Sequence, residues 1–228
     1  MKFKKGIVQL ILMSLLITMV SCRGGDNAKG HHQEGLIPIE HQPVSVEHQA
    51  YDTSTMHIRH NSLANNFTHK DFIILDQPYQ PGESTKAELD QVVNAYLKVK
   101  DALVNDDIAE ADKAASVMSE KVTAVIPTKL EGKGLEAWQN HQALYLAKLD
   151  EMKHISGLEK KRSYFSHISE IMYCTIKSFG LKQGNLFVIF CPMAFDGKGA
   201  YWISGSKIIQ NPYFGKKMPT CGEIKETI

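Results

Sequence analysis

The sequence predicts a mainly α-helical fold: an antiparallel four-helix bundle, then a C-terminal β-hairpin and a sulfur-containing loop. Four successive stretches between residues 85 and 180 carry apolar residues at helical spacing. Short connections join these stretches, which favours antiparallel packing of neighbouring helices. After Gly180 the pattern changes to short, β-rich runs that are bounded by turn residues.

The N-terminus predicts export and a lipid anchor. A positive segment precedes the apolar stretch Ile7–Val20, which is shorter than the ~20 apolar residues that a membrane-spanning helix needs. The stretch ends in Met19-Val20-Ser21-Cys22, which resembles a bacterial lipobox. We therefore expect residues 1–21 to be a lipoprotein signal peptide and Cys22 to carry the lipid. An ordinary cleaved signal or an uncleaved anchor would leave Cys22 incidental.

A lipid anchor would place the protein in the cell envelope, and we expect it to face the periplasm rather than the cell surface. Thiols in that oxidising compartment must pair, bind metal or be protected. The formal net charge is +1, so no basic surplus points to nucleic acid as a partner.

Residues 22–81 predict a flexible, histidine-rich linker between the anchor and a folded domain over residues 82–228. The segment is polar, lacks sustained periodicity and contains seven of the ten histidines. Imidazoles could make it a metal-collecting arm, or histidine could be frequent there by chance; both interpretations stay open. The candidate ligands in this arm are His31, His32, His57 and His60.

The first two helices have recognisable starts. Thr85-Lys-Ala-Glu88 has the capping-box pattern, and apolar residues follow at helical spacing as far as about Asn105. Asp107–Glu110 repeats the pattern and opens the second helix, which Pro127 ends.

The third helix is expected from around Leu135, and Ser156-Gly-Leu-Glu159 predicts the start of the fourth. Gly180 is the expected C-terminal cap of that fourth helix. Its buried stripe should comprise Phe165, Ile168, Met172, Ile176 and Phe179.

The C-terminal segment predicts a hairpin. Asn185–Phe190 and Ala200–Ser204 are β-rich, and Asp196–Gly199 between them has turn chemistry. Because an isolated hairpin is only marginally stable, it should pack on the bundle.

Four sulfur side chains lie at this hairpin and in the closing tail: Cys191, Met193, Met218 and Cys221. If the tail folds back onto the hairpin, the four converge. Two thiolates and two thioethers are soft ligands that suit Cu(I) or Ag(I), and the thiolates alone could suit zinc. Alternatively, a Cys191–Cys221 disulfide would stabilise the fold by ~3 kcal/mol in the loop-entropy picture. The residues alone do not decide between the two.

Two further candidates lie on the fourth helix. His167 could turn toward the C-terminal segment as an additional metal ligand, whereas Cys174 is expected to be a small apolar core residue. The two positions are seven residues apart, roughly 10 Å along the axis, which is too far for one metal ion between them.

Three segments of the chain resemble an uncharacterised bacterial domain family that occurs alone in exported lipoproteins. In order, they are RSYFSHISEIMY, CPMAFDGKGAYWIS and NPYFGKKMPTCG. The family also occurs as a C-terminal extension of the periplasmic adaptor subunits of copper/silver efflux pumps. The resemblance covers roughly Ser84–Ile228 and implies an accessory role in heavy-metal handling, with the four sulfur residues matching the family's sulfur positions. The histidine-rich arm departs from the family pattern.

The leading expectation is a lipid-anchored periplasmic protein that sequesters Cu(I) or Ag(I), or hands the ion to an efflux-pump component. The alternative is a disulfide-stapled protein-interaction module of the cell envelope that binds no metal. We do not expect an enzyme, since the sequence contains no nucleophile elbow, zinc-hydrolase helix motif or phosphate loop.

Overall fold

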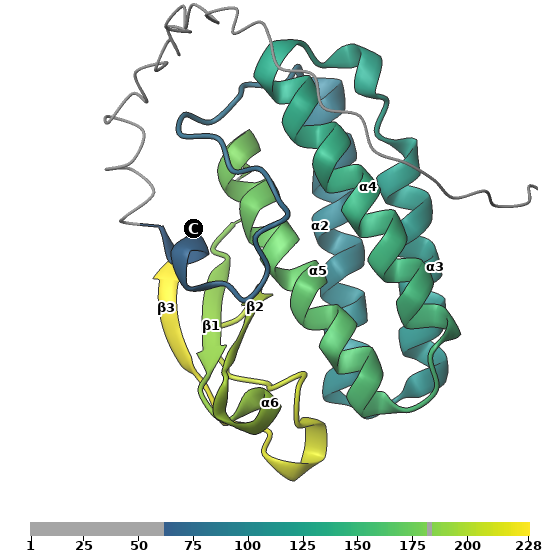
Figure 1. Ribbon diagram of the computed structural model, residues 1–228, viewed down its shortest axis with the longest axis vertical. Coiled ribbons are helices and arrows are strands. Elements are labelled where there is room, and N and C mark those ends of the chain that lie inside the picture. The colour runs from purple at the N-terminus through teal and green to yellow at the C-terminus, as the bar shows by residue number, and fades with distance from the viewer. Residues whose placement is uncertain (1–61, 182–183) are drawn as a thin grey trace, which may run out of the picture. The chain divides into compact units, whose positions relative to one another are not determined.

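A computed structural model describes residues 62–181 and 184–228 (Figure 1). The chain divides into two units, residues 1–49 and 50–228, and all described residues belong to the second. The expected signal peptide, the lipidation site Cys22 and the arm histidines His31, His32, His57 and His60 lie outside the described residues.

Four long helices pack side by side, as predicted (Figure 1). They are α2 (Glu83–Val104), α3 (Ile108–Ala124), α4 (Gly132–His154) and α5 (Leu158–Phe179). Each helix packs on the next, and α5 also packs on α2, so the four enclose a common core. In the described part of the chain, no helix is both long enough and apolar enough to cross a membrane.

The expected helix starts are confirmed in one case and wrong in two. The Asp107 carboxylate accepts from the amide of Glu110 and caps α3, as predicted. In contrast, α2 begins two residues before Thr85, whose side chain is buried in the bundle instead of capping it. The N-terminal cap of α5 is Gly157 rather than Ser156. The residues at these two boundaries, Gly82 and Gly157, offer no side chain that could cap the helix.

The last helix, α5, is buried on nearly every face. Its predicted apolar stripe is buried, and Gly180 forms the expected left-handed C-terminal cap. Polar residues on the other faces are buried as well, among them Ser169, Glu170 and Thr175. They are covered because α5 packs against α4, α2 and the strand β2 at once. The fourth helix is therefore the centre of the fold and not one wall of a bundle.

The C-terminal segment forms a three-stranded antiparallel sheet beside α5 (Figure 1). The predicted hairpin is confirmed as β1 (Phe187–Cys191) and β2 (Ala200–Ser204). A third strand, β3 (Glu223–Thr227), pairs with the other side of β1 and was not predicted. Its sequence EIKET has a single bulky apolar residue and is mostly exposed, so it lacks the pattern of a half-buried strand.

Residues 62–81, hereafter the strap, lie against the helices, although the sequence placed them in the linker. The ring of Phe67 is buried and meets the rings of Tyr173 and Tyr201. Backbone amides along the strap donate to side chains of the helices, such as Leu75 to Ser178 at 3.0 Å. The folded unit thus begins before residue 82, because a few apolar strap residues complete the cover of α5.

The remaining short elements connect these parts. They are η1 (Leu63–Asn66) in the strap, η2 (Pro127–Lys129) between α3 and α4, α6 (Ala194–Gly197) between β1 and β2, and η3 (Gly215–Lys217) before β3.

Candidate sulfur site and histidine cluster

Cys191 and Cys221 are in direct contact. Cys191 ends β1 with its side chain fully buried, and Cys221 stands two residues before β3 and is partly exposed. Their sulfur atoms lie 3.0 Å apart, so one thiol hydrogen-bonds to the other. Because β3 pairs with β1, the closing tail returns to the strand that carries Cys191.

The two methionines lie beside this thiol pair. A backbone hydrogen bond from Met193 reaches the thiol of Cys221, and the amide of Cys221 donates to the carbonyl of Met218 at 3.4 Å. Met193 is 57% exposed, and Met218 is half-buried. The tail therefore folds back as the sequence suggested and brings the four sulfur residues into one region. We call this region the sulfur site.

A hollow of about 710 Å³ opens next to the sulfur site, and both methionines line it. Three aromatic residues, Phe195, Tyr213 and Phe214, form much of its apolar surface. Phe195 has φ 52° and ψ 57°, a left-handed conformation that is uncommon for a bulky residue. Non-glycine residues in this region store strain and cluster at functional sites. The turn that follows Met193 is thus held by its surroundings and not by local preference.

The surroundings of Cys221 and Cys174 raise the pKa of both thiols. The hydrogen bond with Cys191 and, after it, burial raise the pKa of Cys221, and the backbone hydrogen bond from Met193 opposes them. Burial raises the pKa of Cys174 well above its usual value, in keeping with the expected core role of that residue. Binding of a metal ion at Cys221 would therefore have to displace a proton.

An arginine fastens the loop that closes the hollow. Nε of Arg162 donates to the carbonyl of Pro212 at 2.7 Å, and Nη2 donates to the Asp106 carboxylate at 2.5 Å. The same carboxylate accepts from the amide of Lys216 at 3.2 Å. Gly215 lies against this pair with φ +54°, and a Cβ atom there would overlap the Asp106 carboxylate. Both the conformation and the space at this position thus require glycine.

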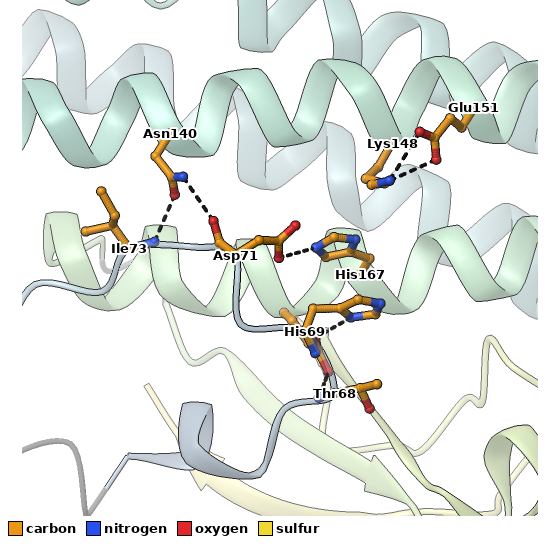
Figure 2. A network of polar contacts seen from close by, with 9 residues as sticks. Thr68, His69, Asp71, Ile73, Asn140, Lys148, Glu151 and His167 are labelled. Atoms are coloured by element: carbon orange, nitrogen blue, oxygen red, sulfur yellow. Dashed lines mark hydrogen bonds and ion pairs between the residues drawn. The ribbon is translucent and has the colours of Figure 1, made fainter. Parts of the chain in front are cut away.

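His167 lies in a second group of polar side chains, the histidine cluster, formed by His69, Asp71, His167 and Glu170. The first three are labelled in Figure 2. Nε2 of His167 is 2.8 Å from the carboxylate of Asp71, and the His167 ring stacks on that of His69 with 3.7 Å between centroids. Nδ1 of His69 is 2.7 Å from Glu170. The contacts of His167 are therefore with the strap, and the structure does not join it to the sulfur residues.

Glu170 anchors the strap from inside the fold. Its carboxylate is almost fully buried and also accepts from the backbone amides of Thr68 at 2.9 Å and His69 at 3.1 Å. Burial lowers the pKa of His167, and the charge of His69 acts in the same direction, although Asp71 and Glu170 partly oppose both. The ring of His167 is thus neutral at neutral pH.

The described residues contain no group of three or more His, Cys, Asp or Glu side chains that could hold a metal ion. The sulfur site does not fall in that class, because two of its four candidate donors are thioethers. Any ion bound there would depend on two thiolates and on methionine sulfur.

Several residues of these sites are not among those that the sequence predicts. His69 is one of the seven histidines of the arm, and Asp71, Glu170 and Arg162 are not candidate ligands. An acidic residue inside the apolar run Ile168–Cys174 is the one signal that could have indicated Glu170, because a charge there must find a partner when buried.

Comparison with known proteins gives one match. Residues 92–184 match the family model described as "Protein of unknown function (DUF3347)". No curated protein and no solved structure matches the chain. The matched range contains most of α2 and all of α3, α4 and α5, and it ends before β1. The expected resemblance to an uncharacterised domain family is therefore confirmed for residues 92–184, while the four sulfur residues lie outside the matched range.

Proposed function

Given that residues 92–184 are a domain of the DUF3347 family, whose function is unknown, we propose a function from the sulfur site. The protein binds Cu(I) or Ag(I) as cargo, with Cys191 and Cys221 as the principal ligands and Met193 and Met218 beside them. The observation that carries this proposal is the 3.0 Å contact between two thiols from segments thirty residues apart, with both methionines beside it.

The donor set suits a soft ion. Thiolate and thioether sulfur select monovalent copper and silver over harder ions. Two thiolates that share a tetrahedral ion with 2.3 Å metal–sulfur bonds lie about 3.7 Å apart, so the pair would open by less than about 1 Å. Cys221 is partly exposed and precedes an edge strand, so it is the side that can move.

We propose the hollow, which both methionines and neither cysteine line, as the approach to the site. Met193 is exposed at its rim, and a thioether there can take a soft ion without losing a proton. Ligand exchange from methionine to the thiol pair would then move the ion inward, with no bond-making chemistry beyond coordination. The same exchange in reverse would hand the ion to a partner protein. We propose that this partner is a component of an efflux pump.

We place this activity in the cell envelope, on the periplasmic side, with a lipid anchor at Cys22. Three features of the N-terminus support this placement: the positively charged segment before Ile7, the short apolar stretch Ile7–Val20, and Cys22 itself. The intact mass of the protein extracted from membranes checks it: the mass should lack residues 1–21 and include acyl chains. A mass that retains residues 1–21 would contradict the anchor.

Anaerobic titration of the reduced full-length chain with Cu(I), against a competing chelator, tests the metal function. All preparations carry Cys22→Ser, so that only three thiols remain. We expect one tightly bound ion, and we expect Cys191→Ser and Cys221→Ser each to abolish tight binding. Cys174→Ser is the matched control, because that thiol is buried elsewhere in the core. Binding that survives both substitutions would overturn the proposal.

A second candidate is a protein-interaction module in which Cys191 and Cys221 form a disulfide. The same thiol contact favours it, together with the aromatic residues around the hollow. Thiol counting on native protein taken from cells and then treated with reduced dithiothreitol separates the two candidates, because a permanent staple stays oxidised and leaves neither cysteine free to bind metal.

A further inference from the structure

We propose that Cys191 and Cys221 form a reversible thiol–disulfide switch that closes the sulfur site to its cargo, and that Cys221 is the sulfur that exchanges with a dithiol protein. This inference rests on the proposed function, since it names how the same site is regulated and by which class of partner.

The two sulfurs are already close to bonding distance. A disulfide bond is about 2.05 Å long, so the 3.0 Å contact must shorten by only about 1 Å. The closing tail is held in register by Asn211, whose side chain donates to the carbonyl of Cys221 at 2.6 Å and whose amide donates to that of Pro219 at 2.8 Å. Formation of the bond therefore requires no rearrangement of the sheet.

The space behind Cys221 is closed as well. A Cβ atom on Gly222 would come within 2.7 Å of the ring of Trp202 and 3.1 Å of Ile189, so the tail backbone lies directly on the sheet. This close approach keeps Cys221 over the end of β1. The pair is thus preorganised from both the strand and the tail.

Exposure distinguishes the two sulfurs. The side chain of Cys191 is fully buried, whereas Cys221 is partly exposed. Exchange proceeds by attack of a thiolate along the sulfur–sulfur axis, so the attacking group must reach the sulfur from outside. A partner can do so at Cys221 and not at Cys191, which makes Cys191 the resolving thiol.

Closure would use the disulfide of a partner protein as the oxidant. The Cys221 thiolate attacks that disulfide and forms a mixed disulfide, and one partner cysteine leaves as a thiolate. The Cys191 thiolate then attacks the Cys221 sulfur, the Cys191–Cys221 bond forms, and the second partner cysteine leaves. Two electrons pass to the partner, which ends as a dithiol, and the two thiol protons are released to water or taken up by the partner thiolates. Reduction by a dithiol partner follows the same steps in reverse.

Closure removes both thiolate ligands at once. A disulfide sulfur is not a thiolate, so only the thioethers of Met193 and Met218 would remain for a soft ion. We expect oxidation to weaken Cu(I) binding by at least about a hundredfold, more than loss of an outer-shell partner usually costs. Reduction of the same sample should restore the original affinity.

One experiment measures this gating with the full-length chain carrying Cys22→Ser. It is equilibrated with a large excess of oxidised glutathione or with reduced dithiothreitol, freed of the reagent, and titrated anaerobically with Cu(I). A disulfide that forms between Cys191 and Cys221 while the affinity is unchanged would overturn the gating, as would a pair that stays reduced in oxidised glutathione. A reduced chain that binds no Cu(I) would instead overturn the proposed function, whatever the pair does.

A second measurement tests the assignment of Cys221 without any metal. Each cysteine of the pair is studied alone, in Cys191→Ser or Cys221→Ser with Cys22→Ser and Cys174→Ser also present, by its reaction with an aromatic disulfide reagent. The thiol of Cys221 should react at least about tenfold faster than that of Cys191, because access controls the rate. Equal rates in chains that retain the helical circular dichroism of the unsubstituted protein would overturn the assignment.

Discussion

His141 lies in the core of the bundle. Its side chain is fully buried, its Nδ1 is 3.1 Å from the hydroxyl of Thr175, and its Nε2 contacts the carbonyl of Ile73 in the strap. Burial lowers its pKa to about 4, and the contact with Ile73 opposes this in part. In the sequence His141 stands between the polar residues Asn140 and Gln142, so nothing there indicates that it is buried.

This burial makes the stability of the protein depend on pH. The unfolded chain takes up a proton at His141 below pH 6.5, whereas the folded chain does so only near pH 4. The free energy of unfolding should therefore fall by up to about 3 kcal/mol between pH 6.5 and 4. The lowered pKa of His167 acts in the same direction.

Urea unfolding at a series of pH values checks this prediction, with His141→Gln as the comparison. The substituted chain should be less stable at pH 7 but should lose less stability on acidification. Identical pH slopes for the two chains would show that His141 does not titrate as its burial requires.

The strap is the element that ties the N-terminal side of the folded unit to α4 and α5. Asn140 bridges it by accepting from the amide of Ile73 at 2.8 Å and donating to the carbonyl of Asp71 at 3.0 Å (Figure 2). Glu170 accepts from two further strap amides and from His69. Fastening therefore depends on side chains of the helices that reach the backbone of the strap.

Glu170→Ala should release the part of the strap that carries Thr68 and His69. Removal of the acceptor leaves two partly buried backbone amides without this partner, which costs about 1 kcal/mol of the free energy of unfolding. Hydrogen exchange should show faster exchange at the amides of Thr68 and His69 than in the unsubstituted chain.

Glu120→Ala on the exposed face of α3 is the matched control, and it should change neither the stability nor the exchange of these amides. If the strap amides in Glu170→Ala remained as protected as in the control, the assigned role of Glu170 would be wrong.

The elements that could be predicted from sequence are those with a long local pattern. The four helices and the hairpin carry their periodicity within about 5 to 23 residues, and all were anticipated. The strap and β3 were not, because each is stabilised by distant partners: the strap by α4 and α5, and β3 by β1. Of the three predicted N-terminal caps only that of α3 is confirmed, because only Asp107 both stands at the boundary and accepts from the amide three residues later.

For the molecule as a whole, the sulfur site depends on chain closure. The identities of its four residues could be read from sequence, and their convergence followed once the tail was assumed to fold back. Their partners could not be read: the Cys191–Cys221 contact and the separate fastening of His167 by Asp71 join segments 30 and 96 residues apart. Residues 92–184, which match the family model, supply the helices on which this C-terminal site is built.

X-ray absorption spectroscopy at the copper edge, on the reduced full-length chain loaded with one Cu(I), tests whether the sulfur site holds the ion. We expect only sulfur atoms to be bound to the copper, and fewer of them when Met193 and Met218 are replaced by leucine. A first shell dominated by nitrogen, unchanged in Cys191→Ser and Cys221→Ser, would mean that imidazoles hold the ion and that the sulfur site does not.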